Sequence, residues 1–201
     1  MTPIEIWFAV GSTYTWLGVE RIRRLQEAED LAVSWHPYST RVVMSELGTL
    51  PKNAPVKLSY MWRDLERRAL RLGLSPRLPA PYPLAEYDRA NHLAVLAAQE
   101  GWCLEYLVAT YARWMEQGQV AGEEPNLTGA LTDIGRDPRD TLARADAPEI
   151  AAAFVTNTDS ARQYGIFGAP TFRVGDEIFW GEDRLDDAID WARHGALRPA
   201  D

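Results

Sequence analysis

The segment GSTYTWL, residues 11–17, carries two hydroxyl side chains where a redox protein would carry a pair of cysteines. A strand-like run ends just before Gly11, and helical spacing of apolar residues begins just after it, so Ser12 and Thr15 lie at a strand-to-helix junction. A helix N-terminus has unpaired N–H groups and a partial positive charge of about +0.5, so it favours an anion such as a thiolate. Ser12 could donate a hydrogen bond to such an anion, or it could simply cap the helix.

The cysteine content argues against disulfide chemistry. Cys103 is the single cysteine, so the chain has no CxxC pair and no internal disulfide, and we do not expect disulfide oxidoreductase activity. We interpret Cys103 as a small buried apolar residue rather than a reactive thiol. The three histidines, His36, His92 and His194, are scattered and predict no metal site.

Length and composition predict a globular α/β protein. The 201 residues suit one domain, or one domain with a large insertion, and 46% of them are hydrophobic. A chain of this size buries roughly 70% of its unfolded surface, which is enough for a core without metal or disulfide. The net charge of −8 argues against a nucleic-acid partner. The N-terminus lacks a signal-peptide pattern, and no run of about 20 apolar residues predicts a membrane span, so we expect a cytoplasmic protein.

Both ends of the chain predict strands. Residues 4–10 and 31–38 are rich in apolar residues and flank a helical pattern, which predicts a β-α-β unit with parallel strands and a right-handed crossover. Residues 170–174 and 178–180 predict a hairpin, followed by an amphipathic helix over 182–195.

The middle of the chain predicts helices and no strand. A proline-rich loop is expected over 75–84, and Asp137 is expected to cap a helix that has Pro138 at its first position. The helical patterns cover 55–74, 85–101, 103–118, 127–135, 137–146 and 147–165.

Four segments give the chain a resemblance to a known family. They are GSTYTWLGVE at residue 11, NAPVKLSYMWRD at residue 53, NTDSARQYGIFGAPTF at residue 157 and FWGEDRL at residue 179. In this order they resemble the glutathione-dependent 2-hydroxychromene-2-carboxylate isomerases, relatives of the kappa-class glutathione transferases among the Dsb-type thioredoxin-like proteins. The resemblance implies a thioredoxin-like α/β fold with a large all-helical insertion. Residues 1–50 and 166–201 would form the thioredoxin-like domain, and residues 51–165 would form the helical insertion.

The resemblance makes Ser12 the catalytic residue. Thr13 and Thr15 depart from the Pro and Ser that the family has at these places. A glutathione thiol has a pKa near that of Cys, about 8.5, so little of it is ionised at neutral pH. A hydroxyl that donates to a charged group contributes about 1.5–3 kcal/mol, which corresponds to about 1–2 pKa units. We therefore expect Ser12 to stabilise the thiolate of bound glutathione rather than to act as a nucleophile.

The resemblance also implies the rest of the glutathione site. The Ala169–Pro170 bond would be cis and would leave the backbone N–H and C=O of Ala169 free to pair with glutathione as an added strand. Trp180, Gly181, Glu182 and Asp183 would hold the γ-glutamyl end, with Asp183 on its ammonium group.

Several of these residues have a plain structural interpretation as well. Glu182 and Asp183 could simply cap the last helix, and Glu182 departs from the Ser that many kappa-type relatives carry there. Arg184 is expected to form a structural salt bridge. Asn53, assigned to glutathione and substrate, could be an ordinary turn residue.

Substrate-binding residues are the least defined part of the site. Lys57 or Arg41 could hold a substrate carboxylate. Lys57 shares one face of a helix with Tyr60 and Asp64, and this face could be purely structural, with Tyr60 packed. Tyr82 would provide an aromatic surface.

One departure affects the acceptor pocket. Ala85 stands where the family often has Asn, so it cannot donate a hydrogen bond to an acceptor substrate.

The resemblance implies that the protein catalyses glutathione-dependent cis-trans isomerisation of an aromatic carboxylate of the 2-hydroxychromene-2-carboxylate type. It also implies a homodimer. A kappa-like transferase or peroxidase would share the thiolate site but form a stable adduct. A thioredoxin-like module without a CxxC pair could also bind a partner without catalysing a reaction.

Overall fold

A four-stranded mixed sheet connects the two ends of the chain. In the computed structural model, which describes residues 1–28, 31–50 and 55–198, the strand order is β2-β1-β3-β4. Strand β1 (Ile4–Phe8) pairs in parallel with β2 (Val33–Pro37) and antiparallel with β3 (Thr171–Val174), and β3 pairs with β4 (Glu177–Trp180). The predicted parallel β-α-β unit and the predicted C-terminal hairpin are therefore both confirmed.

Strand alternation explains why both faces of the sheet are covered. Ile4, Ile6 and Phe8 point to one face and join the main core, whereas Trp7 points to the other face and packs in a smaller cluster with Tyr38. Both faces of β1 are apolar, as expected of a strand inside a sheet.

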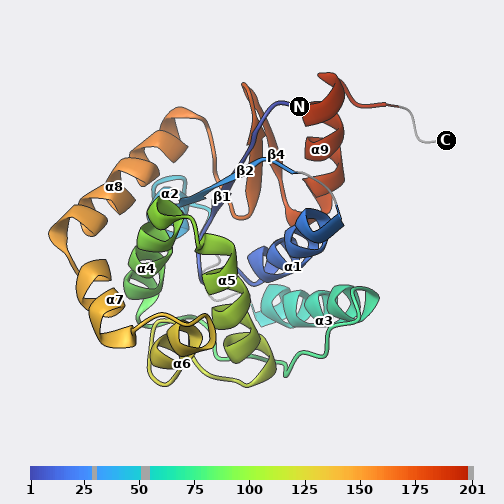
Figure 1. Cartoon of the computed structure of the whole chain (residues 1–201). Helices are drawn as coiled ribbons and strands as arrows, with labels where there is room; N and C mark the ends of the chain where they lie inside the picture. The colour runs from blue at the N-terminus through green and yellow to red at the C-terminus, as the bar shows by residue number, and fades with distance from the viewer. Residues whose placement is uncertain (29–30, 51–54, 199–201) are drawn as a thin grey trace.

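Helices α4 to α7 form one group at one side of the sheet (Figure 1), whereas α2 and α8 contribute Val43 and Ala161 to the smaller cluster around Trp7. Helix α3 lies next to α1. Helix α8 packs against α4, α2 and β2, and the chain then continues into β3. The boundaries 51–165 of a separate helical domain stay a prediction. The helical elements are α1 (Thr13–Ala28), α2 (Thr40–Glu46), α3 (Pro55–Arg71), α4 (Tyr87–Glu100), α5 (Cys103–Tyr111), the π-helix Ala112–Glu116, α6 (Asn126–Asp133), α7 (Pro138–Ala145), α8 (Pro148–Gln163), the 3₁₀ turn Glu182–Arg184 and α9 (Leu185–His194).

Local sequence signals explain several helix boundaries. Asp137 caps α7 by accepting a bond from Asp140 N at 2.8 Å, and Pro138 takes the first turn, as predicted. The stretch 75–84 forms neither helix nor strand, also as predicted. Helix α2 was not predicted, although Ser39 caps it by accepting a bond from Val42 N.

Two helix predictions are wrong in part. Residues 103–118 do not form one α-helix, because the chain widens into a π-helix from Ala112 onwards. The final helix does not begin as an α-helix at residue 182, because Glu182–Arg184 form a 3₁₀ turn before α9.

Cys103 is buried, as expected. Its Sγ lies 3.8 Å from the carbonyl oxygen of Ala94, and burial raises the pKa of this thiol well above its usual value. A thiol held in its neutral form is a poor nucleophile, which supports a packing role.

Phe172 on β3 gives a test of the core. It is fully buried and pairs with Ile6 and Phe179 across the sheet. We expect Phe172→Ala to lower the free energy of unfolding by about 3–5 kcal/mol, because a large cavity opens in the core. Phe167→Ala, at a side chain that is 40% exposed, is the control and should cost less than about 1 kcal/mol in denaturant unfolding. Equal losses would contradict this description of the core.

Candidate functional site

The turn between β1 and α1 directs the Ser12 hydroxyl across the molecule. Its Oγ donates to the carbonyl of Ala169 at 2.8 Å, whereas Thr15 N approaches the same oxygen only at 3.4 Å. The capping contact is therefore the weaker of the two. The main partner of Ser12 is the backbone of a segment 157 positions away in sequence.

The Ala169–Pro170 peptide bond is cis, as the resemblance implied. The Pro170 carbonyl accepts a hydrogen bond from Gly181 N at 2.9 Å, so this turn connects α1 with the end of β4. The expectation that the Ala169 carbonyl is free is wrong here, because it accepts the Ser12 hydroxyl.

A cavity of about 480 Å³ opens beside this turn. Five of the residues predicted for glutathione meet in its wall, although they lie on two separate segments of the chain. Tyr14 of α1 and three residues of α3 complete the lining with Arg184. The lining residues are Tyr14, Tyr60, Asp64, Arg68, Ala169, Trp180, Gly181, Glu182, Asp183 and Arg184.

Tyr14 is a site residue that was missed, although it lies inside the first quoted motif. Its hydroxyl donates to Asp64 Oδ2 at 3.0 Å. Burial, and then the hydrogen bond to Asp64, raise the pKa of Tyr14, so the phenol stays neutral at ordinary pH. The cavity wall thus contains an uncharged hydroxyl fixed by a carboxylate.

The face of α3 that carries Tyr60 and Asp64 borders the cavity. Tyr60 is 62% exposed and lines the cavity, so the expectation that it packs inside is wrong. Asp64 lines the cavity too and holds Tyr14. Helical spacing had placed these two residues on one face, but only the packing of α3 against α1 shows that this face borders the cavity.

Glu182 is a buried anchor for the segment that opens α9. Its side chain is 3% exposed, and its carboxylate forms ion pairs with Arg21 of α1 at 3.3 Å and with Arg68 of α3. Arg21 also donates to the Glu182 carbonyl at 2.5 Å. The carboxylate and carbonyl of one residue therefore attach the 3₁₀ turn to α1 and α3. Helix capping, the plain interpretation of Glu182, does not describe these contacts.

Asp183, unlike Glu182, presents its carboxylate to solvent at the cavity. Its side chain is 45% exposed and pairs with Arg184 at 3.0 Å. Arg184 also pairs with Asp187 at 3.0 Å, so its predicted salt bridge is confirmed. Trp180, 54% exposed, adds an aromatic surface to the wall.

The predicted substrate residues that the structure describes, Arg41, Lys57 and Tyr82, lie outside this lining. Arg41 donates to the carbonyl of Leu84 and stacks over the ring of Tyr87 at 4.1 Å. Tyr82 packs edge-on against Trp62, with ring centroids 5.9 Å apart, and Lys57 is exposed.

Two further features complete the comparison with the predicted site. Asn53 falls outside the described residues. A larger hollow of about 610 Å³, lined by residues such as Trp35 and Cys103, contains none of the predicted residues.

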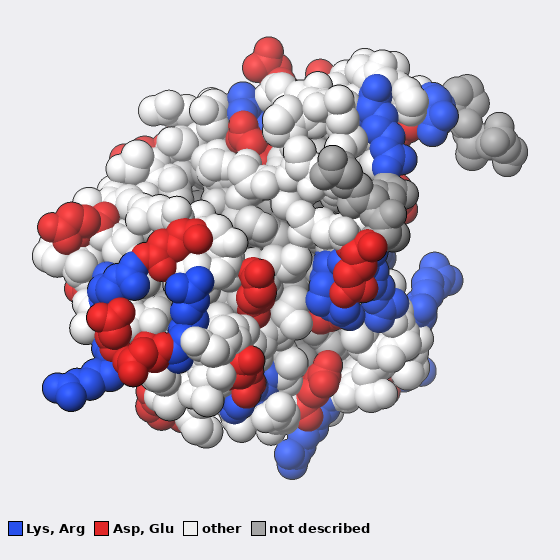
Figure 2. All heavy atoms as spheres, viewed as in Figure 1, with Lys and Arg blue, Asp and Glu red and all other residues white. Residues whose placement is uncertain are grey.

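Acidic and basic side chains are interspersed on the face shown in Figure 2, with wide neutral areas between them. Among the described residues, no helix is long and apolar enough to cross a membrane.

Comparison with known proteins shows the family of this chain. The family model described as "DSBA-like thioredoxin domain" matches residues 3–190. The chain belongs to this family. The 2-hydroxychromene-2-carboxylate isomerase of Sphingobium xenophagum is 25% identical over 91% of this chain and 94% of the relative.

Two further similar proteins cover nearly the whole chain. The glutathione S-transferase kappa 2 of Caenorhabditis elegans is 25% identical over 94% of this chain and 90% of its own. A solved 2-hydroxychromene-2-carboxylate isomerase superposes with a TM-score of 0.83 at 23% identity, covering 94% of this chain and 93% of the other. This DsbA-like protein therefore has the thioredoxin-like fold that the four segments implied.

Glu182 provides a test of how the site is held. We expect Glu182→Gln to lower the free energy of unfolding by about 1–3 kcal/mol, because Arg21 and Arg68 lose the buried carboxylate that they share. Asp186→Asn is the matched control: Asp186 also pairs with Arg21, at 2.6 Å, but is 78% exposed. Its loss should cost less than about 1 kcal/mol in denaturant unfolding, and equal costs would argue against the anchoring role.

Proposed function

We propose that this protein is a glutathione-dependent cis-trans isomerase of aromatic carboxylates of the 2-hydroxychromene-2-carboxylate type. One observation carries the proposal: the Ser12 hydroxyl lies at the N-terminus of α1 and contacts the cis-proline turn that borders the cavity. The names of the relatives, an isomerase and a glutathione transferase, agree with this assignment.

The groups around the cavity fit a tripeptide thiol. The cis-proline turn offers backbone groups, Asp183 an exposed carboxylate for an ammonium group, and Arg184 a cation for a carboxylate. Tyr14 adds a neutral hydroxyl. These donors and acceptors match the peptide bonds and charged ends of glutathione.

The residues of this chain would act on the sulfur as follows. When bound, glutathione supplies a thiolate that adds reversibly to a conjugated carbon, so that a double bond becomes single, rotates and re-forms as the thiol leaves. Ser12 would turn its hydroxyl from the Ala169 carbonyl to the sulfur and donate to the anion. The N–H groups at the start of α1 would favour the same negative charge. No group of the protein is consumed, because glutathione is regenerated with its proton.

The remaining assignments belong to the same proposal. Asn53 would contact glutathione and substrate, and Arg41, Lys57 and Tyr82 would bind the aromatic carboxylate. The proposal also includes a homodimer, which the resemblance implies, and a cytoplasmic location.

A second function shares the same site. A kappa-like transferase would leave a stable adduct, whereas an isomerase returns free glutathione with an isomerised product, so a product assay separates them. If calorimetry shows no glutathione binding at millimolar concentration, a non-catalytic binding module is favoured instead.

Ser12→Ala tests the central assignment. We expect turnover of a hydroxychromene carboxylate with glutathione to fall at least about tenfold, because a hydrogen bond to a charged sulfur contributes about 1.5–3 kcal/mol. Ser39→Ala is the matched control, since the Ser39 side chain also caps a helix, where it accepts from Val42 N, but it does not donate to the Ala169 carbonyl as Ser12 does. Steady-state kinetics of both variants give the comparison. Unchanged turnover in Ser12→Ala would refute the role of this hydroxyl.

Asp183→Asn tests the glutathione end of the cavity. We expect the Kd for glutathione to rise by roughly tenfold, because the loss of a charge-assisted bond costs about 1.5–3 kcal/mol, while kcat at saturating glutathione changes little. Asp187→Asn removes the other partner of Arg184 and should leave the Kd nearly unchanged. Equal Kd values for the two variants in calorimetry would exclude Asp183 as a ligand.

A further inference from the structure

Two buried polar residues of the helical segment reach the turn that carries Ser12. Asn91 of α4 is fully buried; its Oδ1 accepts a bond from Val10 N at 2.8 Å and its Nδ2 donates to the Val10 carbonyl at 3.0 Å. One amide thus satisfies both backbone groups of Val10, as a neighbouring strand would. The chain just after β1 is held by α4 rather than by the sheet.

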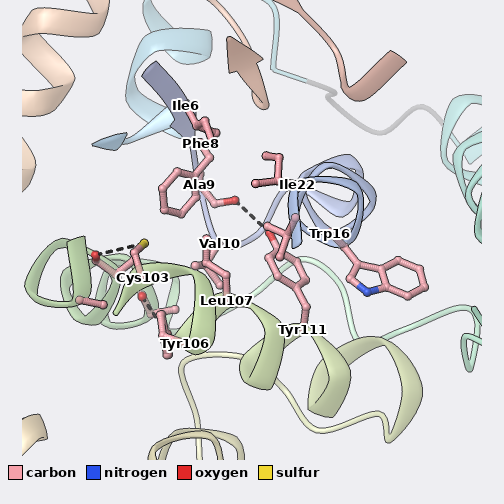
Figure 3. Packing of buried hydrophobic residues seen from close by; sticks show 14 of the residues in the cluster. Ile6, Phe8, Ala9, Val10, Trp16, Ile22, Cys103, Tyr106, Leu107 and Tyr111 are labelled. Atoms are coloured by element: carbon pink, nitrogen blue, oxygen red, sulfur yellow. Dashed lines mark hydrogen bonds between the residues drawn. The ribbon is translucent and has the colours of Figure 1, made fainter. Parts of the chain in front are cut away.

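Tyr111 reaches the next part of the same turn. Its hydroxyl lies 3.0 Å from the Ser12 carbonyl and 3.3 Å from the Ala9 carbonyl. Figure 3 shows the ring of Tyr111 extending from α5 towards Ala9, at the point where β1 gives way to α1. Burial raises the pKa of Tyr111, so its hydroxyl stays available as a donor.

The packing around Tyr111 fixes its ring. Tyr111 ends α5, and the chain continues as the π-helix Ala112–Glu116, a kind of helical widening often found at functional sites. Within the π-helix, Trp114 stacks on the ring of Tyr111, with ring centroids 5.7 Å apart and ring planes 25° apart. Trp114 is in turn held by a bond from its Nε1 to the Pro81 carbonyl at 2.8 Å.

These contacts determine where the Ser12 side chain can point. The Ser12 N–H donates to the Ala9 carbonyl at 3.1 Å, and the Ser12 carbonyl faces Tyr111 in the core. Because both backbone groups of Ser12 are bonded on the core side, its side chain points away from the core. Its Oγ lies 2.8 Å from the Ala169 carbonyl oxygen.

We propose that Tyr111 is a positioning residue for the Ser12 hydroxyl, so that the helical segment acts on the sulfur site through the turn that carries Ser12. This inference rests on the function proposed above. Tyr111 touches neither glutathione nor substrate in this role; it orients the turn from the core side.

Tyr106 offers a matched control on the same helix. It is also fully buried, and its hydroxyl donates to a backbone carbonyl, that of Ala90, at 3.0 Å. This bond connects α5 with α4 and not with the Ser12 turn. Tyr106→Phe therefore removes the same group from an equally buried place without touching the site.

Tyr111→Phe and Tyr106→Phe should differ in the acidity of bound glutathione. We expect Tyr111→Phe to raise the pKa of the bound thiol by about half a unit, as measured by thiolate absorbance against pH. A shift of this size corresponds to a roughly threefold lower kcat. KM should change less than kcat. Tyr106→Phe should leave both quantities at the wild-type value even where its thermal stability falls equally.

Two further measurements separate positioning from general destabilisation. In a Ser12→Ala background, Tyr111→Phe should lower kcat no further, because its effect passes through the missing hydroxyl. Hydrogen exchange of the amides of residues 9–16 should speed up in Tyr111→Phe and not in Tyr106→Phe.

The outcomes are distinct. Equal thiol pKa, kcat and exchange in the two Tyr→Phe variants would overturn the role of Tyr111 and leave the proposed function intact. A wild-type protein that does not lower the thiol pKa of glutathione would instead overturn the proposed function, and the positioning role with it.

Discussion

The site depends on one hydrogen bond between distant parts of the chain, from the Ser12 hydroxyl to the Ala169 carbonyl. It joins the N-terminus of α1 to the cis-proline turn, and the Pro170 carbonyl continues the connection to Gly181 at the end of β4. A donor is therefore held where the positive end of a helix meets backbone groups suited to a peptide. In the proposed function, the sulfur of bound glutathione would take the place of the Ala169 carbonyl as the acceptor of this hydrogen bond.

Two kinds of support surround this bond, and they differ in chemistry. On the core side, uncharged side chains such as Asn91 and Tyr111 satisfy the backbone of the turn, because buried polar groups without partners would be costly. On the cavity side, the buried Glu182 carboxylate draws Arg21 and Arg68 together and holds the 3₁₀ turn in place. Hydrogen bonds between uncharged groups therefore orient the Ser12 turn, whereas ion pairs hold the 3₁₀ turn at the cavity wall.

Sequence patterns predicted the strands, the hairpin and most helices because these follow from local periodicity and turn residues. They failed to predict features that depend on contacts between distant parts of the chain. The helix expected over 103–118 becomes a π-helix from Ala112, where Trp114 packs against Tyr111. Tyr60 was expected to pack, yet it is exposed, because helical spacing shows which residues share a face but not what that face meets.

The sequence by itself determined the family, the strand-to-helix turn with serine in place of cysteine, and the segments from which a glutathione site would be built. Short motifs carry this information because turn and capping chemistry act over a few residues. Only the tertiary structure decided that Tyr14 bonds to Asp64, that Glu182 is an internal anchor, and that Tyr111 lies behind Ser12. These contacts join residues far apart in the chain, and their partners are chosen by how helices pack on the sheet, which no local pattern encodes.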